Sequence, residues 1–249
     1  MHQIHFRYAA ARTLLAPFFY GATPGIPSDR DAREVALQAP LRVLFDRSER
    51  GGVTVYEAAE EVRALAEAVA VGAAGAARMP RDLWELAMRS GPGGEPATLR
   101  DIAEYVDTWQ AAMDRKLLAA VPTVWELERR FPQLGNMLRP YFGQDGIALE
   151  DEDLSDEDGI GLYVANWHLV GTCLWHFPLV VAECAEALAL FQDDATLRRF
   201  FADELGLGSG SHTSWSAWLT LISEVLTTHL RQEHGPCSWT SGREGHSPC

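Results

Sequence analysis

The sequence has few cysteines, and their placement does not suit a disulfide framework. The four are Cys173, Cys184, Cys237 and Cys249, and none of them forms a C-x-x-C pair. Small secreted proteins that depend on disulfides carry a denser, regularly spaced set. The cysteine pattern therefore indicates a protein of a reducing compartment.

Long apolar runs are also missing. No stretch reaches the roughly 18 uninterrupted apolar residues that would suggest a membrane-spanning helix. The first eight residues contain His2, Gln3, His5 and Arg7 where the apolar part of a signal peptide would lie. We therefore expect a cytoplasmic protein that has no membrane partner.

Motifs that mark common enzyme sites are absent from the sequence as well. The chain contains no G-x-S-x-G turn, no phosphate-binding loop, no H-E-x-x-H pair and no dinucleotide-binding glycine pattern. We expect a protein that is not an enzyme and that uses no cofactor.

Basic residues are scarce in the second half of the chain. The net charge is −14; residues 1–121 hold 16 acidic and 14 basic residues, whereas residues 122–234 hold 18 acidic and 6 basic ones. An acidic surface repels nucleic acid, whose phosphates need Lys and Arg, and it attracts basic proteins. We expect a basic protein partner and no nucleic acid.

Helical patterns dominate what is present. Apolar residues make up 47% of the 249 residues, enough for a sizeable core in one or two domains. Capping boxes such as Thr54-x-x-Glu57 precede apolar stripes with helical spacing. We predict a mainly α, bundle-like fold with two helical domains: residues 1–121, of unknown role, and residues 122–234, followed by a disordered tail at 235–249.

Individual helices are harder to predict in three places. Residues 31–45 give mixed signals, because Leu41, Val43 and Phe45 alternate. Pro140 is expected to end or kink a helix near Arg139, and Pro178 is expected to open a new one, because proline lacks the backbone N–H.

Residues 130–145 form the stretch with the most distinctive pattern. They read R-F-P-Q-L-G-N-M-L-R-P-Y-F-G-Q-D and place four apolar side chains on one helical face: Leu134, Leu138, Tyr141 and Phe142. We predict that the two aromatic residues pack in the core of the second domain with Phe201, Trp215, Trp218 and Leu219.

This stretch resembles the opening of a bacterial immunity-protein family, the small helical family associated with contact-dependent growth inhibition. The resemblance rests on F-P-x-L followed by Y-F-x-Q-D, the latter formed by Tyr141, Phe142, Gln144 and Asp145, and it covers about residues 123–230. Family members usually carry His at the place of Gly143 and often Trp at that of Gly146. The resemblance implies an immunity protein that binds and neutralises a cognate toxin.

An acidic run follows the motif and is our candidate toxin-binding site. Residues 150–158 contain seven carboxylates, and no register of the run supplies both the alternating ligands and the glycine of a calcium loop. The candidate residues are Asp145, Glu150, Asp151, Glu152, Asp153, Asp156, Glu157 and Asp158. Nucleases are one class of toxin that this charge would suit, because their substrate-binding surfaces are basic.

Two other functions stay open. An enzyme, a small hydrolase or a metal-dependent one, could place its site around His168, Cys173 and His176, although we favour satisfied core histidines and expect no metal there. The chain could also be an acidic adaptor for some other basic protein.

Overall fold

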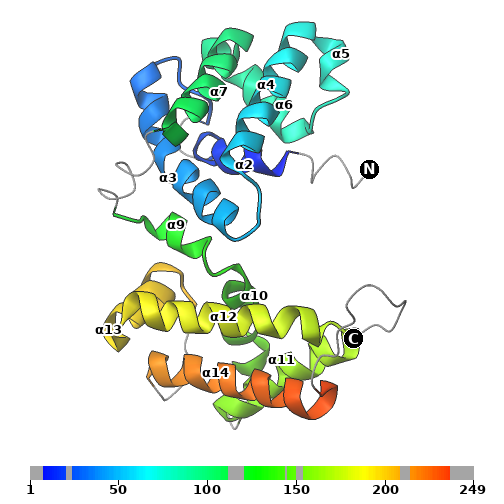
Figure 1. Ribbon diagram of the computed structural model, residues 1–249, viewed down its shortest axis with the longest axis vertical. Helices are drawn as coiled ribbons and strands as arrows, with labels where there is room; N and C mark the ends of the chain where they lie inside the picture. The colour runs from blue at the N-terminus through cyan, green and yellow to red at the C-terminus, as the bar shows by residue number, and fades with distance from the viewer. Residues whose placement is uncertain are drawn as a thin grey trace. The chain divides into compact units, whose positions relative to one another are not determined.

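The computed structural model describes residues 8–20, 24–111, 121–143, 145–149, 154–207 and 214–235. These ranges are helical and contain no strand, so the predicted mainly α fold is confirmed (Figure 1). The chain divides into two compact units, Met1–Leu127 and Glu128–Cys249. The predicted tail at 235–249 lies outside the described residues except for Gly235.

The first unit is built around α4 and α7, which pack along each other. Its helices are α2 (Ala9–Leu14), η1 (Ala16–Phe18), α3 (Arg30–Glu49), α4 (Val55–Val71), α5 (Ala73–Ala76), α6 (Arg81–Arg89), η2 (Gly91–Gly94), α7 (Pro96–Ala111) and α9 (Val124–Glu128). The predicted box of Thr54 and Glu57 caps α4 as expected. On α7, Ile102, Val106 and Trp109 follow each other at spacings of four and three residues, and all three are buried.

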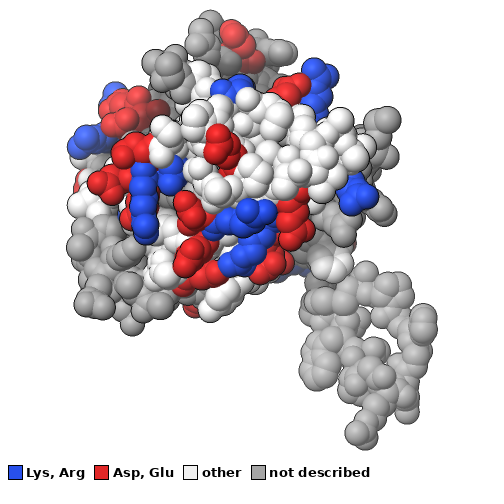
Figure 2. All heavy atoms as spheres, turned by 90° about the horizontal axis from the view of Figure 1, so that it is seen from above, with Lys and Arg blue, Asp and Glu red and all other residues white. Residues whose placement is uncertain are grey.

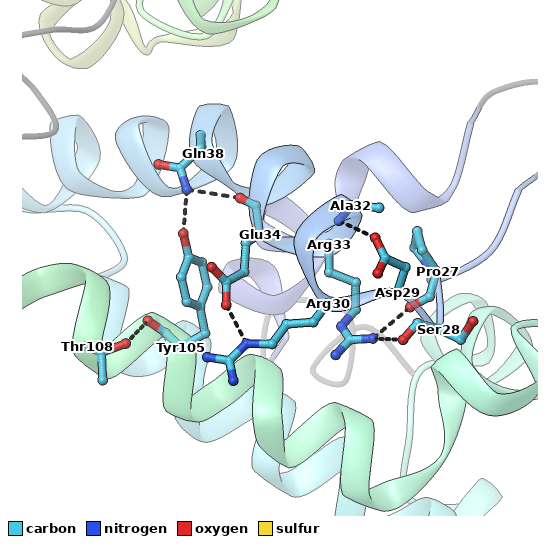
Figure 3. A network of polar contacts seen from close by, with 10 residues as sticks. All are labelled: Pro27, Ser28, Asp29, Arg30, Ala32, Arg33, Glu34, Gln38, Tyr105 and Thr108. Carbon is cyan, nitrogen blue, oxygen red and sulfur yellow. Dashed lines mark hydrogen bonds and ion pairs between the residues drawn. The ribbon is translucent and has the colours of Figure 1, made fainter.

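The long helix α3 occupies the region of mixed sequence signals, and a polar network holds it (Figure 3). Asp29 caps the helix by accepting from the Ala32 amide at 2.9 Å. The nearly buried Arg33 donates to the Pro27 and Ser28 carbonyls. Gln38 donates to the Tyr105 hydroxyl on α7. The start of α3 is therefore held by residues just before it, and its middle is held by Tyr105 of α7.

The second unit is organised by α12, which lies beside α14 (Figure 1). Its helices are α10 (Pro132–Phe142), η3 (Ile147–Leu149), α11 (Asp156–Val170), α12 (Cys173–Phe191), α13 (Asp194–Arg198), η4 (Arg199–Glu204), α14 (Trp215–His229) and η5 (Leu230–His234). Two of these segments, η4 and η5, have π-helical geometry.

Aromatic side chains form the core of this unit, as predicted. Phe142 meets Trp218 edge-to-face at 4.9 Å between ring centroids, and Trp215 stacks on Phe201 at 5.3 Å. Tyr141 meets Tyr163 edge-to-face at 5.2 Å. All these rings are buried, so the helices α10, α11, α14 and η4 share one apolar centre.

Within the described residues, α12 is the one helix long and apolar enough to cross a membrane by length and composition, with mean hydropathy 1.5. Its carboxylates are both used inside the second unit. Glu183 accepts from the Leu134 amide at 2.8 Å, and Glu186 pairs with Arg130 at 2.7 Å. Both carboxylates of α12 therefore have partners within the second unit.

Candidate functional site

The described part of the acidic run forms the first turn of α11. Ser155 caps the helix through a capping box with Asp158, whose amide donates to the Ser155 hydroxyl at 3.1 Å. The Asp158 carboxylate accepts from the same hydroxyl at 2.6 Å. Glu157 and Asp158 are exposed, and Asp156 is half-buried. Carboxylates are favourable here, because the helix N-terminus carries partial positive charge.

The remaining candidates of the acidic site are placed as follows. Asp145 is exposed in the turn after α10, in the left-handed region with φ 62°. Residues 150–153 lie outside the described residues, and so does Gln144 of the family motif. The described carboxylates of the acidic site are therefore those of α11 and Asp145.

The solvent face of α11 changes from acidic to apolar along its length. Asp158, Leu162, Ala165 and Leu169 follow each other at spacings of four, three and four residues, which places them on one helical face. All four are exposed. This face opposes the one that buries Ile160 and Tyr163 in the core.

Large apolar side chains gather at the turn between α11 and α12. Leu169 is 87% exposed and Trp175 is 81% exposed, and Val170 and Leu179 are also exposed. Trp175 and Leu179 lie one helical turn apart on α12. An exposed tryptophan among exposed aliphatic side chains is typical of a binding surface rather than of solvent-facing helix.

The aromatic residues of the family-like motif are core residues. Tyr141 and Phe142 are buried, and so they present no surface to a partner. A Cβ atom on Gly146 would lie 2.5 Å from the Tyr141 carbonyl oxygen, and one on Gly143 would lie 2.5 Å from that of Arg139. The backbone approaches itself so closely here that larger side chains would require it to move.

Of the two histidines and the cysteine singled out in the sequence, the structure brings only His168 and Cys173 together. His168 and Cys173 lie together, with 4.0 Å between Nδ1 and Sγ. His176 turns away and packs on the Trp167 ring instead, at 3.6 Å between centroids. Burial lowers the pKa of His176, which favours its neutral form.

Two further histidines, which the sequence interpretation overlooked, complete this cluster. One potential ligand atom from each of His168, Cys173, His229 and His234 lies within 4.8 Å of the others. His229 ends α14 and His234 ends η5. The sequence does contain a signal that could have revealed the cluster. The spacing H-x4-C occurs at 168–173 and the spacing H-x4-H at 229–234, each at the end of a predicted helix.

The first unit offers a different kind of surface, with charges of both signs in pairs. Arg81 pairs with Glu85 at 2.6 Å, and Arg63 pairs with Glu60 at 2.5 Å and with Asp107. On the face drawn in Figure 2, red Asp and Glu side chains are likewise interspersed with blue Lys and Arg. Paired charges give a weak net field, so they attract partners less than a single-sign cluster does.

A hollow in the first unit is too small for an organic ligand. It lies between α3 and α7, with Arg30, Leu37, Asp101 and Tyr105 among its lining residues, and its volume is about 10 Å³. That volume corresponds to about one water molecule.

Comparisons with protein families, with curated proteins and with solved structures found no match for this chain.

Proposed function

We propose that this protein is a bacterial immunity protein, which binds a cognate toxin and neutralises it. The observation that carries the proposal is the solvent face of α11, which is acidic at its start and apolar at its end. The proposal also rests on the family resemblance of residues 123–230.

The acidic end of this face suits a basic toxin surface. Asp156, Glu157 and Asp158 follow each other in the first turn and give this end of α11 a single sign of charge. A basic partner is captured faster by such a surface, because opposite charges raise association rates about 10- to 1,000-fold.

The apolar end of the α11 face would add binding energy through contacts that a partner buries. Leu169 and Trp175 are largely exposed, and tryptophan is among the residues that dominate binding energy when a partner covers them. At about 1.5 Å per residue, the 15 residues of α11 span roughly 22 Å. One interface of about 800 Å² per partner can cover both ends of the helix.

Neutral variants of the acidic turn test the electrostatic part. Asp156→Asn with Glu157→Gln removes two charges and leaves the capping box of Ser155 and Asp158 in place. The matched control, Asp203→Asn with Glu224→Gln, removes two exposed charges elsewhere in the second unit. With the toxin encoded beside this gene, we expect the first pair to lower the association rate about tenfold at low salt, and the control to leave it within about twofold.

Truncation of the exposed tryptophan tests the apolar part. Trp175→Ala should raise the dissociation rate and weaken toxin binding by about 2 kcal/mol, whereas Tyr56→Ala, which truncates an exposed ring on α4, should not change it. Unaltered binding and cell protection in both the charge variant and Trp175→Ala would place the toxin surface elsewhere. A metabolic gene neighbour in place of a toxin gene, with no toxin bound, would favour the enzyme or adaptor alternatives.

A further inference from the structure

Four metal-ligating side chains meet at one end of the second unit. They come from the last turn of α11 (His168), the first residue of α12 (Cys173), the last residue of α14 (His229) and the end of η5 (His234). The Nδ1 atom of His168 lies 3.3 Å from Nε2 of His229 and 4.0 Å from Sγ of Cys173. Segments about 60 residues apart in the sequence thus converge on one point.

The local backbone of each pair explains the convergence. Gly171 ends α11 in the left-handed region with φ 77°, which reverses the chain so that α12 starts beside the last turn of α11. His229 and His234 are five residues apart, and in an α-helix this separation would place their side chains about 140° apart around the helix axis. The π-helical hydrogen bonding of η5 is i→i+5, and it returns His234 to the face of His229.

The spacing of the three imidazole rings is that of ligands around one ion. Their centroids are 5.0 Å apart for His168 and His229, 5.7 Å for His168 and His234, and 5.3 Å for His229 and His234. A tetrahedral Zn²⁺ with Zn–N bonds of about 2.0–2.1 Å would hold its nitrogens about 3.4 Å apart and its ring centroids about 5 Å apart. The Nδ1 atom of His168 and the sulfur of Cys173 are 4.0 Å apart, and the four ligand atoms lie up to 4.8 Å from one another, so the widest pair has to close by roughly 1 Å around the ion.

The cluster also leaves a buried polar atom unused. The Nε2 atom of His234 is inaccessible to solvent and has no hydrogen-bond partner, and a buried nitrogen without a partner is costly. Neutral imidazoles are the form that binds metals.

We propose that His168, Cys173, His229 and His234 bind one zinc-class divalent cation in a tetrahedral site. One thiolate and three imidazoles suit Zn²⁺, and they suit Mg²⁺ and Ca²⁺ poorly, since those ions prefer oxygen ligands. On binding, the Cys173 thiol loses its proton to solvent and the sulfur bonds the cation.

Four protein ligands make this a closed, structural site. A catalytic zinc keeps one position for water or substrate, and here all four positions are taken. The ion would fasten the α11–α12 turn, which presents Leu169 and Trp175, to the end of α14. The inference does not depend on the proposed immunity function, because it rests on the geometry of the cluster alone.

Cobalt spectroscopy tests the site directly on the full chain. The background protein carries Cys237→Ser and Cys249→Ser, which removes the two tail thiols, and is stripped of metal with a chelator. We expect one equivalent of Co²⁺ to give the intense visible bands of four-coordinate cobalt together with a thiolate-to-metal charge-transfer band. Zn²⁺ should bleach both bands by displacement.

Single variants then assign the ligands. Cys173→Ser should abolish the charge-transfer band, and His229→Gln or His234→Gln should each weaken Zn²⁺ binding at least about 100-fold, more than the 10- to 100-fold typical of losing a supporting residue around a ligand. His176→Gln is the matched control, because His176 lies on α12 with Cys173 but outside the cluster. This variant should bind Zn²⁺ with the affinity of the background protein. Far-ultraviolet circular dichroism confirms that each variant is folded.

Two results would overturn the proposal. The first is a folded background protein that gives no four-coordinate cobalt spectrum at one equivalent. The second is Zn²⁺ binding that Cys173→Ser, His229→Gln and His234→Gln leave unchanged, because the metal would then be held by other residues.

Discussion

At the scale of the residue, Glu126 shows how a nearly buried carboxylate is kept charged. Its side chain is 8% exposed, and both oxygens accept hydrogen bonds, from the Arg42 guanidinium at 2.5 and 2.9 Å and from Thr123 at 2.8 Å. Burial alone would raise its pKa, but the hydrogen bonds from Arg42 and Thr123 outweigh burial and lower the pKa.

We therefore predict a stability cost for Glu126→Gln that depends on pH. Because the folded pKa lies below the unfolded one, the stabilisation is present above the ordinary glutamate range and is lost as the pH falls through the folded value. At pH 7 the variant should lose about 1.5–3 kcal/mol, the range for hydrogen bonds to a charged group. Urea titrations at pH 7 and pH 3 check this: an equal loss at both pH values would contradict the assignment.

Trp218 carries a second prediction at this scale. Its ring is 1% exposed and contacts Phe142 and Trp215, and its buried Nε1 atom has no hydrogen-bond partner. Trp218→Ala should cost about 3–5 kcal/mol, as for other buried aromatic side chains. Trp218→Phe should cost clearly less, because it keeps most ring contacts and removes the unpaired N–H. Equal melting temperatures for both variants and the parent would put this ring outside the core.

The cluster of His168, Cys173, His229 and His234 could not be assembled from the sequence. His168 and Cys173 are near each other in sequence, and the spacing alone led us to pair them with His176. His176 instead packs on Trp167, and the other two histidines of the cluster lie 61 and 66 residues after His168. Only the packing of α14 beside α12, together with the π-helical end of α14, brings them into place.

At the scale of the element, α10 begins without a capping side chain of its own. Phe131 occupies its N-cap position, and the amides of Gln133 and Leu134 donate to Glu183 of α12 at 3.2 and 2.8 Å. The Glu183 carboxylate thus accepts hydrogen bonds from the first-turn amides, the role that an N-cap Ser or Asp of the same helix usually has. It also lies at the positive end of the helix dipole.

We predict that this distant cap stabilises the second unit. Glu183→Ala should cost about 1–3 kcal/mol, because it leaves buried amides unsatisfied. Glu186→Ala is the control: it removes a partly exposed ion pair with Arg130, which is worth at most about 1 kcal/mol. Thermal or urea unfolding of the two variants measures the difference, and equal losses would show that Glu183 acts only as another ion pair.

The predicted helices were largely correct in type, and the prolines account for the errors. Helix α3 runs through Pro40, α10 through Pro140 and α12 through Pro178. Of the end or kink expected near Arg139, the end does not occur, and α12 does not start at Pro178. Each proline removes one backbone hydrogen bond. Buried side chains on both sides of each proline, such as Leu37 and Leu41 or Leu138 and Phe142, offset that loss, and the sequence alone does not reveal such tertiary contacts.

At the scale of the whole molecule, the two units have separate cores. The first core draws its members from residues 10–109, and the aromatic core of the second comes from residues 131–226. The boundary predicted from the sequence lies between residues 121 and 122, whereas the contacts divide the chain after Leu127. The ion pair of Arg42 and Glu126 explains the shift, since it holds the first part of α9 to α3.

We predict, finally, that the second unit folds by itself. A unit of about 120 residues is large enough for its own core. Arg42 and Glu126 both belong to the first unit, so a fragment of Glu128–Cys249 does not break their buried ion pair. Its circular dichroism should be helical and its melting cooperative, and Trp218→Ala should lower the melting temperature as it does in the full chain.

The same fragment separates stability from function. If the toxin is held by the face of α11, the fragment should bind it with the affinity of the full chain, and Met1–Leu127 alone should not bind it. An unfolded fragment would show that the second core depends on the first unit. A folded fragment that binds no toxin would instead assign the toxin surface to the first unit, whose mixed charges would then have to provide the specificity that the acidic turn of α11 is proposed to give.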